Sequence, residues 1–383
     1  MAILSTPRAA SRPPRSPLVR RRAVRSSAVH GRTGLFASGY ARMGTGIFLA
    51  LGIVAAHGRG LTPVAMVVAG LVVLTVAGAY AEGISLFPET GGSAALARHA
   101  FDELTSFVTG WATALALIAT AALSALFAAR YLSVFWDPLA SGGWSVTGAV
   151  VVLVLVSGAA AQGLVASASL AVFAGILDIG VQLLLVVIGV AFAFRPEVIG
   201  QSVHFGTSPS LAGLVVACAL AMAAYTGIES IGEMAAEARH PDRDLAPATA
   251  SVLVSAVSLC VAISLAAVMA APVSGRVSTA RPVLGIVSQI PLHVLASGLG
   301  YIVGLLVTGL LALAAHASIR RFGRLAAWQA QHHQVPARIA DAHPTLETPI
   351  AAVAACAVAA ALLVVAQAAL GGASFMAGVY AFG

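Results

Sequence analysis

Apolar stretches long enough to cross a lipid bilayer recur along most of this 383-residue chain. Crossing the hydrocarbon core as a helix takes about 20 consecutive, mostly apolar residues. Hydrophobic residues make up 59% of the chain and charged residues only 9%. An average soluble domain needs roughly 25% charged residues to cover its surface. The chain is therefore predicted to be an all-α, polytopic membrane protein that lies in a lipid bilayer.

Nine full spans and part of a tenth are expected. The predicted spans are 33–57, 61–86, 104–133, 144–163, 167–194, 209–236, 248–272, 292–318 and 349–370, followed by a short apolar end at 374–383. Residues 33–383 would form one transmembrane domain.

Residues 1–32 have a different composition, with eight arginines, four prolines and no acidic residue. This predicts a basic, disordered tail held at the anionic cytoplasmic face of the membrane. A transit peptide is the alternative, because such peptides are rich in Arg and Ser and poor in acids. Pro13, Pro14 and Pro17 argue against the amphipathic helix that such a peptide needs.

The arginines also predict the orientation of the chain. With a cytoplasmic N-terminus, the cytoplasmic side holds the eight tail arginines and seven from the connections between spans, against five on the other side. The seven are Arg98, Arg239, Arg243, Arg320, Arg321, Arg324 and Arg338. The positive-inside rule therefore places the N-terminus in the cytoplasm, in a plasma or inner membrane.

Several function classes are excluded by residues that the sequence lacks. All 21 basic residues are arginines, so no GxxxxGK[ST] loop exists and an ATP-driven pump with its motor in this chain is excluded. No HExxH, CxxC or Ser/His/Asp pattern occurs, and the three cysteines lie in apolar stretches. We expect no enzyme activity, no metal, no cofactor and no nucleic-acid partner.

Two of the predicted spans contain helix-breaking residues. Gly44 and Gly46 flank Thr45 in the first span, and Gly227 lies in the sixth, beside Glu229. Glycine in a helix interior costs about 1 kcal/mol relative to alanine. Broken helices in corresponding places are typical of transporters built from two five-helix inverted repeats. We expect repeats at about 33–196 and 209–383.

Such breaks have a defined chemistry. Free backbone N–H groups and the positive end of the following half-helix can bind an anion, while free carbonyl groups can bind a cation. An α-amino acid carries both a carboxylate and an ammonium group. A pair of breaks at mid-membrane therefore suits an amino acid substrate. The alternative for Gly44 and Gly46 is close helix packing by small residues.

Four segments, in order, carry a resemblance to a known family. They are "GTGIF" at 44–48, "YAEGISLFPETGGSAALARHAF" at 80–101, "YTGIES" with "EARHPDRDLAPA" at 225–248, and "VPARIADAHPTLETPIAA" at 335–352. The chain resembles the amino acid–polyamine–organocation (APC) superfamily of permeases over residues 44–383. The resemblance implies a LeuT-like inverted-repeat bundle and a secondary transporter of amino acids or related amines by alternating access.

The resemblance also implies a substrate site at the two breaks. The substrate carboxylate would bind the backbone amides of Thr45, Gly46 and Ile47, next to Gly44. The implied ammonium ligands are the carbonyl groups of Arg42, Met43, Ala223 and Thr226. Gly227 would free the second break, and Tyr225 and Ile228 would line the pocket. The uncharged pocket side chains favour neutral or apolar amino acids.

Two intramembrane acids are candidates for coupling or polar contacts. Asp178 lies about 16 Å into the fifth span at 1.5 Å per residue, with Gln182 one turn later on the same face. Many relatives that this chain resembles carry a Lys near this place, so we hypothesise that Asp178 binds a proton or neutralises a bound cation. A protonated or paired structural Asp is the alternative. Glu229 either caps the second break or pairs with a neighbouring helix.

The end of the sequence bears on competence for transport. The final "FMAGVYAFG" resembles the first half of helix 10 of the family, so we expect an incomplete second repeat. A fragment, a clipped gene model or pairing with another chain would account for this. The runner-up function is a non-transporting fragment, subunit or sensor of the same fold. Transport is expected to be either coupled to protons or an exchange of substrates.

Overall fold

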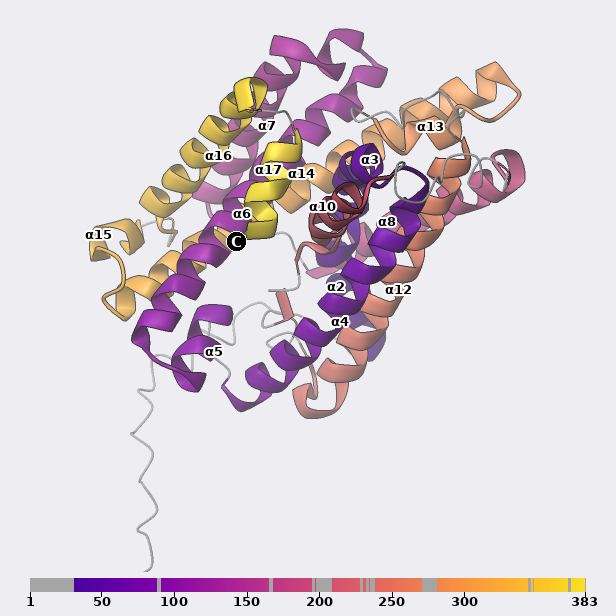
Figure 1. The fold of residues 1–383 in the computed structure, drawn as a ribbon. Helices are drawn as coiled ribbons and strands as arrows, with labels where there is room; N and C mark the ends of the chain where they lie inside the picture. Colours follow the sequence, from indigo (N-terminus) through magenta and orange to yellow (C-terminus); the bar gives the residue numbers. More distant parts are fainter. Residues whose placement is uncertain are drawn as a thin grey trace, which may run out of the picture.

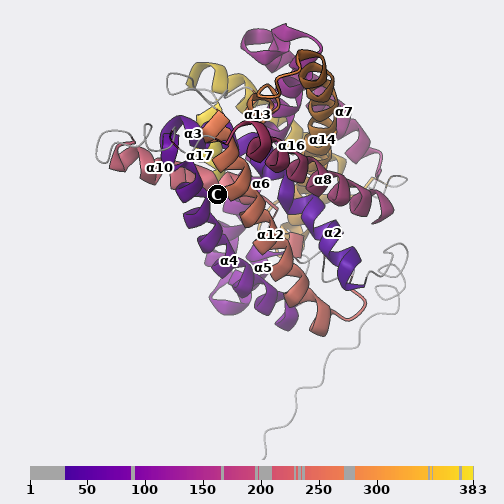
Figure 2. The same ribbon diagram turned by 90° about the vertical axis from the view of Figure 1, so that its right-hand side faces the viewer.

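A computed structural model describes residues 31–383, apart from short segments. The segments left out are 88–90, 165–167, 195–196, 198–208, 228–229, 232–233, 235–237, 271–280, 344–345, 347, 371–372 and 383. The predicted tail and Ile228, Glu229 and Glu233 thus lie outside the described residues. The described chain is mainly helical (Figures 1 and 2).

The helices follow the predicted spans closely. The first half contains α2 (Arg32–Met43), α3 (Ile47–Gly58), α4 (Thr62–Leu86), α5 (Ser93–Ala100), α6 (Glu103–Tyr131), α7 (Gly142–Ala161) and α8 (Ala168–Phe192). The second half contains α10 (Leu211–Ala221), α12 (Pro241–Ala270), α13 (Leu284–Val287), α14 (His293–Gln331), α15 (Ala337–Ala340), α16 (Ile350–Leu370) and α17 (Ala373–Phe382). Short 3-10 turns are η1 (Gly44–Gly46), η2 (Arg59–Leu61), η3 (Leu132–Val134), η4 (Asp137–Ala140) and η5 (Met222–Tyr225).

Seven helical stretches in the described chain are long and apolar enough to cross a membrane. The number is below the nine predicted spans for two reasons. The first stretch, Arg32–Ile84, is 53 residues long and contains two predicted spans, which η2 separates. The sixth predicted span appears as a shorter apolar helix, Leu211–Tyr225, followed by residues only partly described.

One boundary prediction was wrong. The eighth predicted span ends at 318, but α14 continues to Gln331 and is 39 residues long. At 1.5 Å per residue it extends about 58 Å, well beyond a hydrocarbon core of about 30 Å. Arg320, Arg321 and Arg324 therefore lie on a continuing helix and not in a connecting loop. Arginine is a good helix former, so charge alone does not end a helix.

The helices form two groups that are visible in Figure 1. In one group α6, α7, α14 and α16 pack against one another. In the other, α2 packs against α8 and α12, α4 packs against α12, and α10 packs against α3 and α4. The two groups meet where α3 contacts α6 and where α14 contacts α8 and η1.

Large apolar side chains are exposed on the outward faces of these helices. Examples are Val151, Val154 and Leu155 on α7, Val187 and Val190 on α8, and Val358, Leu362 and Val365 on α16. A water-soluble protein rarely exposes apolar patches of this extent. The faces are suited to contact with lipid, as the composition predicts.

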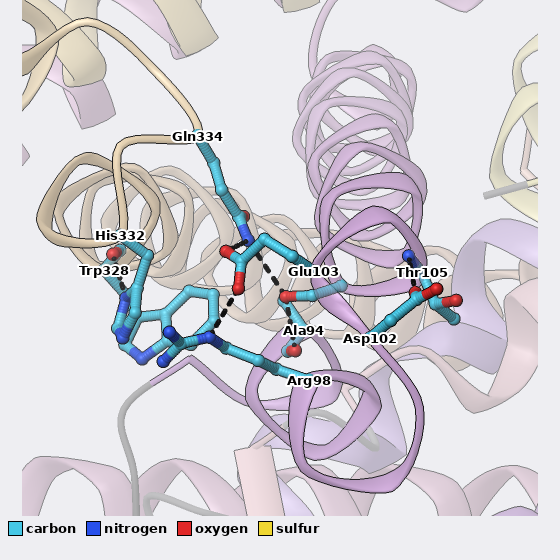
Figure 3. Close-up of polar contacts among 9 residues, drawn as sticks. Ala94, Arg98, Asp102, Glu103, Thr105, Trp328, His332 and Gln334 are labelled. Atoms are coloured by element: carbon cyan, nitrogen blue, oxygen red, sulfur yellow. Dashed lines mark hydrogen bonds and ion pairs between the residues drawn. The ribbon is translucent and has the colours of Figure 1, made fainter.

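A polar cluster joins α5, the start of α6 and the end of α14 (Figure 3). Gln334 donates to Glu103 Oε1 at 2.8 Å and to Ser106 Oγ at 3.0 Å, and Arg98 Nε lies 2.7 Å from Glu103 Oε2. Asp102 begins α6, because its carboxylate accepts the Thr105 N–H at 2.7 Å. Hydrogen bonds from Thr105 lower the pKa of the Asp102 carboxyl. Ionised Asp102 thus supports the start of α6, and acid removes this support.

We expect replacement of Gly175 by Ala to destabilise the contact between α2 and α8. A Cβ atom at Gly175 would lie 2.0 Å from the backbone oxygen of Ala37, and backbone cannot move aside cheaply. Overpacking of this kind costs about 1–3 kcal/mol, so the unfolding midpoint of the purified protein in detergent should fall.

Gly180→Ala is the matched control on the same helix, since nothing lies within 4 Å of a Cβ there. Its midpoint should stay equal or rise, because alanine is the better helix former. Equal midpoints for Gly175→Ala and the parent protein would contradict the close approach of α8 to α2.

Candidate functional site

The first break is a short 3-10 turn between α2 and α3. The Gly44 N–H donates to Tyr40 O, and the Ile47 N–H donates to Thr45 O. The backbone stays in the right-handed region throughout, with φ −77° at Gly44 and −60° at Gly46. The break is therefore shallower than the unwound segment expected from the sequence, and the Ile47 amide already has an acceptor inside the break.

The second break is sharper. After α10 and η5 the chain leaves helical geometry at Thr226, with φ −56° and ψ 148°. Gly227 follows with φ +100°, a conformation that side chains with a Cβ rarely adopt. The Ser230 N–H then donates to Gly227 O. Ile228 and Glu229, two of the predicted site residues, lie outside the described residues at this point.

Glycines hold the two breaks in direct backbone contact. A Cβ atom at Gly46 would lie 2.3 Å from the carbonyl oxygen of Ala224, and one at Gly227 would lie 2.0 Å from the carbonyl oxygen of Arg42. Both distances are far too short for any residue with a side chain. In one contact the first break supplies the glycine and the second break the carbonyl, and in the other these roles are reversed. Together the two contacts fix η1 against the residues of the second break.

The predicted binding residues that the structure describes are gathered in this contact and are buried. Met43, Thr45, Ile47, Ala223, Tyr225 and Thr226 are at most 4% exposed. Gly44, Gly46 and Gly227 are buried as well. The structure thus brings together residues 43–47 and 223–227, which are about 180 positions apart in the sequence.

The Tyr225 side chain attaches the second break to α4. Its hydroxyl donates to Met66 O on α4 at 2.8 Å, and the side chain is 2% exposed. We had expected Tyr225 to line a pocket. In the structure its polar end is used to attach the break to α4.

Tyr131 on α6 reaches the other side of the first break and was missed in the sequence. Its hydroxyl donates to Phe48 O, just after the break, at 3.1 Å. A single tyrosine at the end of a long apolar run was the available signal. This bond connects the two groups of helices near the break.

Asp178 lies at the first break, on α8. The carboxyl group is fully buried, and its Oδ1 atom accepts a hydrogen bond from Gln182 Nε2 at 2.9 Å. Gln182 also donates to Gly44 O at 3.0 Å, and the Tyr40 hydroxyl donates to Gln182 Oε1 at 2.9 Å. The prediction that Asp178 and Gln182 share a face of the helix agrees with this bond. Tyr40 was not predicted.

The second carboxylate oxygen of Asp178 has no hydrogen-bond partner. It lies so close to Gly44 that a Cβ atom there would be 2.6 Å away. Burial of a charge without full pairing is expensive, so such a group is a functional candidate by default. The free acceptor lies beside the backbone of the first break.

Comparison with known proteins identifies the family. A sequence model of the amino acid permease family matches residues 31–383. The chain belongs to this family. The match confirms the resemblance to APC permeases, and the permease is an integral membrane protein with several spans.

Two similar proteins add to this assignment. The permease is 26% identical over 325 residues to the methylthioribose transporter of Bacillus subtilis (strain 168), covering 80% of this chain and 68% of that protein. It also resembles the crystal structure of MhsT in complex with L-phenylalanine, with a TM-score of 0.50 and 14% identity, over 94% of this chain and 87% of that one. The second likeness shows the fold alone. Together the comparisons indicate a non-enzymatic transporter of a small molecule.

We expect Gly46→Ala to separate the two breaks of the permease. The added methyl group would meet the Ala224 carbonyl oxygen, which belongs to backbone. The expected results are a loss of about 1–3 kcal/mol in stability and faster hydrogen–deuterium exchange of the amides at 44–48.

Gly78→Ala on α4 is the control, because nothing lies within 4 Å of a Cβ at that position. It should leave the exchange at 44–48 unchanged and the stability equal or higher, because alanine is the better helix former. If Gly46→Ala behaves like Gly78→Ala, the two breaks are not in contact in the protein.

Proposed function

We propose that this permease is a secondary transporter that moves a neutral amino acid or related amine across the membrane by alternating access. The observation that carries the proposal is the buried contact between two helix breaks, with one free carboxylate oxygen beside it. Backbone groups at such breaks can bind both ends of an amino acid. The described side chains in the breaks are uncharged apart from Arg42, which favours a substrate without a charged side chain.

Helix packing supports two five-helix repeats. Counting the spans in chain order, each of the first four packs against the span five places later. The pairs are α3 with α10, α4 with α12, α6 with α14, and α7 with α16. Packing of four successive spans against their counterparts is what a two-fold axis through the centre of the bundle produces. We infer repeats at about 33–196 and 209–383, related by an axis in the membrane plane.

We propose a cytoplasmic N-terminus for this bundle. The support is the arginine distribution, which includes Arg320, Arg321 and Arg324 on the part of α14 that extends beyond its predicted span. Under the positive-inside rule these residues belong to the cytoplasmic side. The α5–α6–α14 cluster of Figure 3 would then lie on that side as well.

Alternating access would use the two groups of helices. We propose that α6, α7, α14 and α16 form a frame, and that the helices carrying the breaks move against it. Such motion requires an interface that can slide while each group stays intact. The substrate would bind between the breaks when they part, at the amides of Thr45 and Gly46 and at the carbonyls near Arg42, Met43 and Ala223.

Coupling is proposed to depend on Asp178. A buried carboxyl group with one unpartnered oxygen can bind a proton in one state of the cycle and release it in another. The proposal includes protons as the coupling ion. Glu229, at the second break, remains a candidate for polar contact with the substrate amine.

We expect proteoliposomes containing the permease to accumulate labelled L-phenylalanine when the outside is made acidic. Labelled methylthioribose is the second probe, since the B. subtilis relative is named for its transport. Uptake of the sugar and not of the amino acid would overturn the amino acid proposal and keep the transporter. Binding of a probe without any uptake would favour the alternative, a sensor or subunit of the same fold.

Asp178→Asn should abolish uptake driven by the pH gradient and retain exchange of labelled for unlabelled substrate. The amide resembles a permanently neutral acid, so it can no longer carry a proton. Asp137→Asn is the control, because that side chain is 86% exposed and pairs with Arg281. Unchanged proton-driven uptake in Asp178→Asn would contradict the coupling role.

A further inference from the structure

The side-chain amide of Gln182 forms more hydrogen bonds than a residue that only fills space in the core would need. The amide is fully buried and takes part in three hydrogen bonds. Its oxygen accepts from the Tyr40 hydroxyl, and its nitrogen donates both to Gly44 O and to Asp178 Oδ1. An amide NH₂ group has two hydrogens, so both are used. The side chain joins α8, α2 and the first break.

The orientation of this amide is determined by chemistry. A backbone carbonyl can only accept, and an ionised carboxylate can only accept, so the group that faces both must be the NH₂. The amide oxygen then faces Tyr40, whose hydroxyl is able to donate. A flipped amide would place oxygen against two acceptors. Tyr40 therefore holds Gln182 in its single useful orientation.

The bonds of Gln182 depend on the charge of Asp178. A hydrogen bond to an ionised carboxylate is shorter and roughly twice as strong as one to a neutral acceptor. When Asp178 takes up a proton, the hydrogen bond from Gln182 Nε2 to Asp178 Oδ1 weakens. Because the same nitrogen also donates to Gly44 O, this weakening changes the hydrogen bond to the backbone of the break.

We propose that Gln182 is a positioning residue that transmits the protonation of Asp178 to the Gly44 carbonyl of the first break, with Tyr40 fixing its orientation. The inference rests on the proposed proton-binding role of Asp178. It adds the connection between that proton and the substrate site.

Among the described residues, the titratable groups that interact electrostatically with Asp178 are Tyr40 from α2 and Cys260 from α12. Glu229, two positions after Gly227, lies outside the described residues. Arg42 is two positions after Tyr40, which on an ideal helix places it about 200° around the axis from Tyr40. On α14, His316 bonds to the carbonyls of Val156, on α7, and of Leu164. Neither η1 nor α13 carries a titratable side chain.

The test compares hydrogen–deuterium exchange at residues 43–48 between about pH 5 and about pH 8, after correction for intrinsic exchange rates. In the parent protein the protection of this segment should change with pH. Gln182→Met has a similar size and makes no hydrogen bonds, so the pH-dependent difference should be lost. Gln367→Met is the control, because Gln367 is also buried but lies on α16.

Infrared difference spectra of the same samples report the proton itself. The carboxyl band that Asp178→Asn removes should appear with acid in both the parent and Gln182→Met. Tyr40→Phe is a second variant in case Gln182→Met does not fold, and it should reduce the pH-dependent difference by releasing the amide.

The outcomes separate the two proposals. If the Asp178 band does not change with pH in the parent protein, both the coupling role and the link through Gln182 are overturned. If the band changes but folded Gln182→Met, or Tyr40→Phe in its place, keeps the full pH-dependent protection at 43–48, the Gln182 inference alone is overturned. If Gln182→Met loses the pH-dependent change in protection at 43–48 while the Asp178 band still changes with pH, the Gln182 inference is supported.

Discussion

The backbones of the two helix breaks are in direct contact, and this contact determines how the helices at the centre of the structure are arranged. Gly46 meets the carbonyl of Ala224, and Gly227 meets the carbonyl of Arg42. A methyl group at either place would prevent the approach, so both segments must be glycine at the point of contact. The helices on either side then have to cross near these points. The positions of α2, α3 and α10 follow from the contact, and α8 and α12 pack around them.

A helix break inside a membrane creates a second constraint, because unpaired backbone groups have no water to bond to. Side chains from other helices supply the partners here. Gln182 from α8 donates to Gly44 O, and Tyr131 from α6 donates to Phe48 O just after the first break. Tyr225, within the second break, donates to Met66 O and so attaches that break to α4. The breaks are therefore held by the surrounding bundle and do not stand alone as local defects.

Local sequence predicted the helices and the breaks well, because both depend on residues within one span. The apolar runs located α3, α4, α6, α7, α8 and α16 to within a few residues, and the glycines located η1 and the turn at Gly227. The end of α14 was missed, since a run of arginines suits a solvated helix as well as a loop.

The partners of the polar groups could not be predicted from local sequence. Tyr40 and Gln182 are separated by 142 positions, and Tyr225 and Met66 by 159. No pattern within a span shows which distant helix it will face. The place of Asp178 on its helix was predictable, together with Gln182 one turn away. Its contact with Gly44 depends on how α8 packs against α2.

The distribution of polar contacts bears on how the bundle can move. Within the helices that carry the breaks, Tyr40, Gln182, Asp178 and Gly44 are joined by three hydrogen bonds. Across to the frame, the Tyr131 hydroxyl donates to Phe48 O at 3.1 Å, just after the first break. A single neutral hydrogen bond contributes only about 1 kcal/mol net. In the proposed alternating access, the three hydrogen bonds would keep the breaks and Asp178 in one group of helices. A proton on Asp178 and a substrate at the breaks would then be carried by the same group.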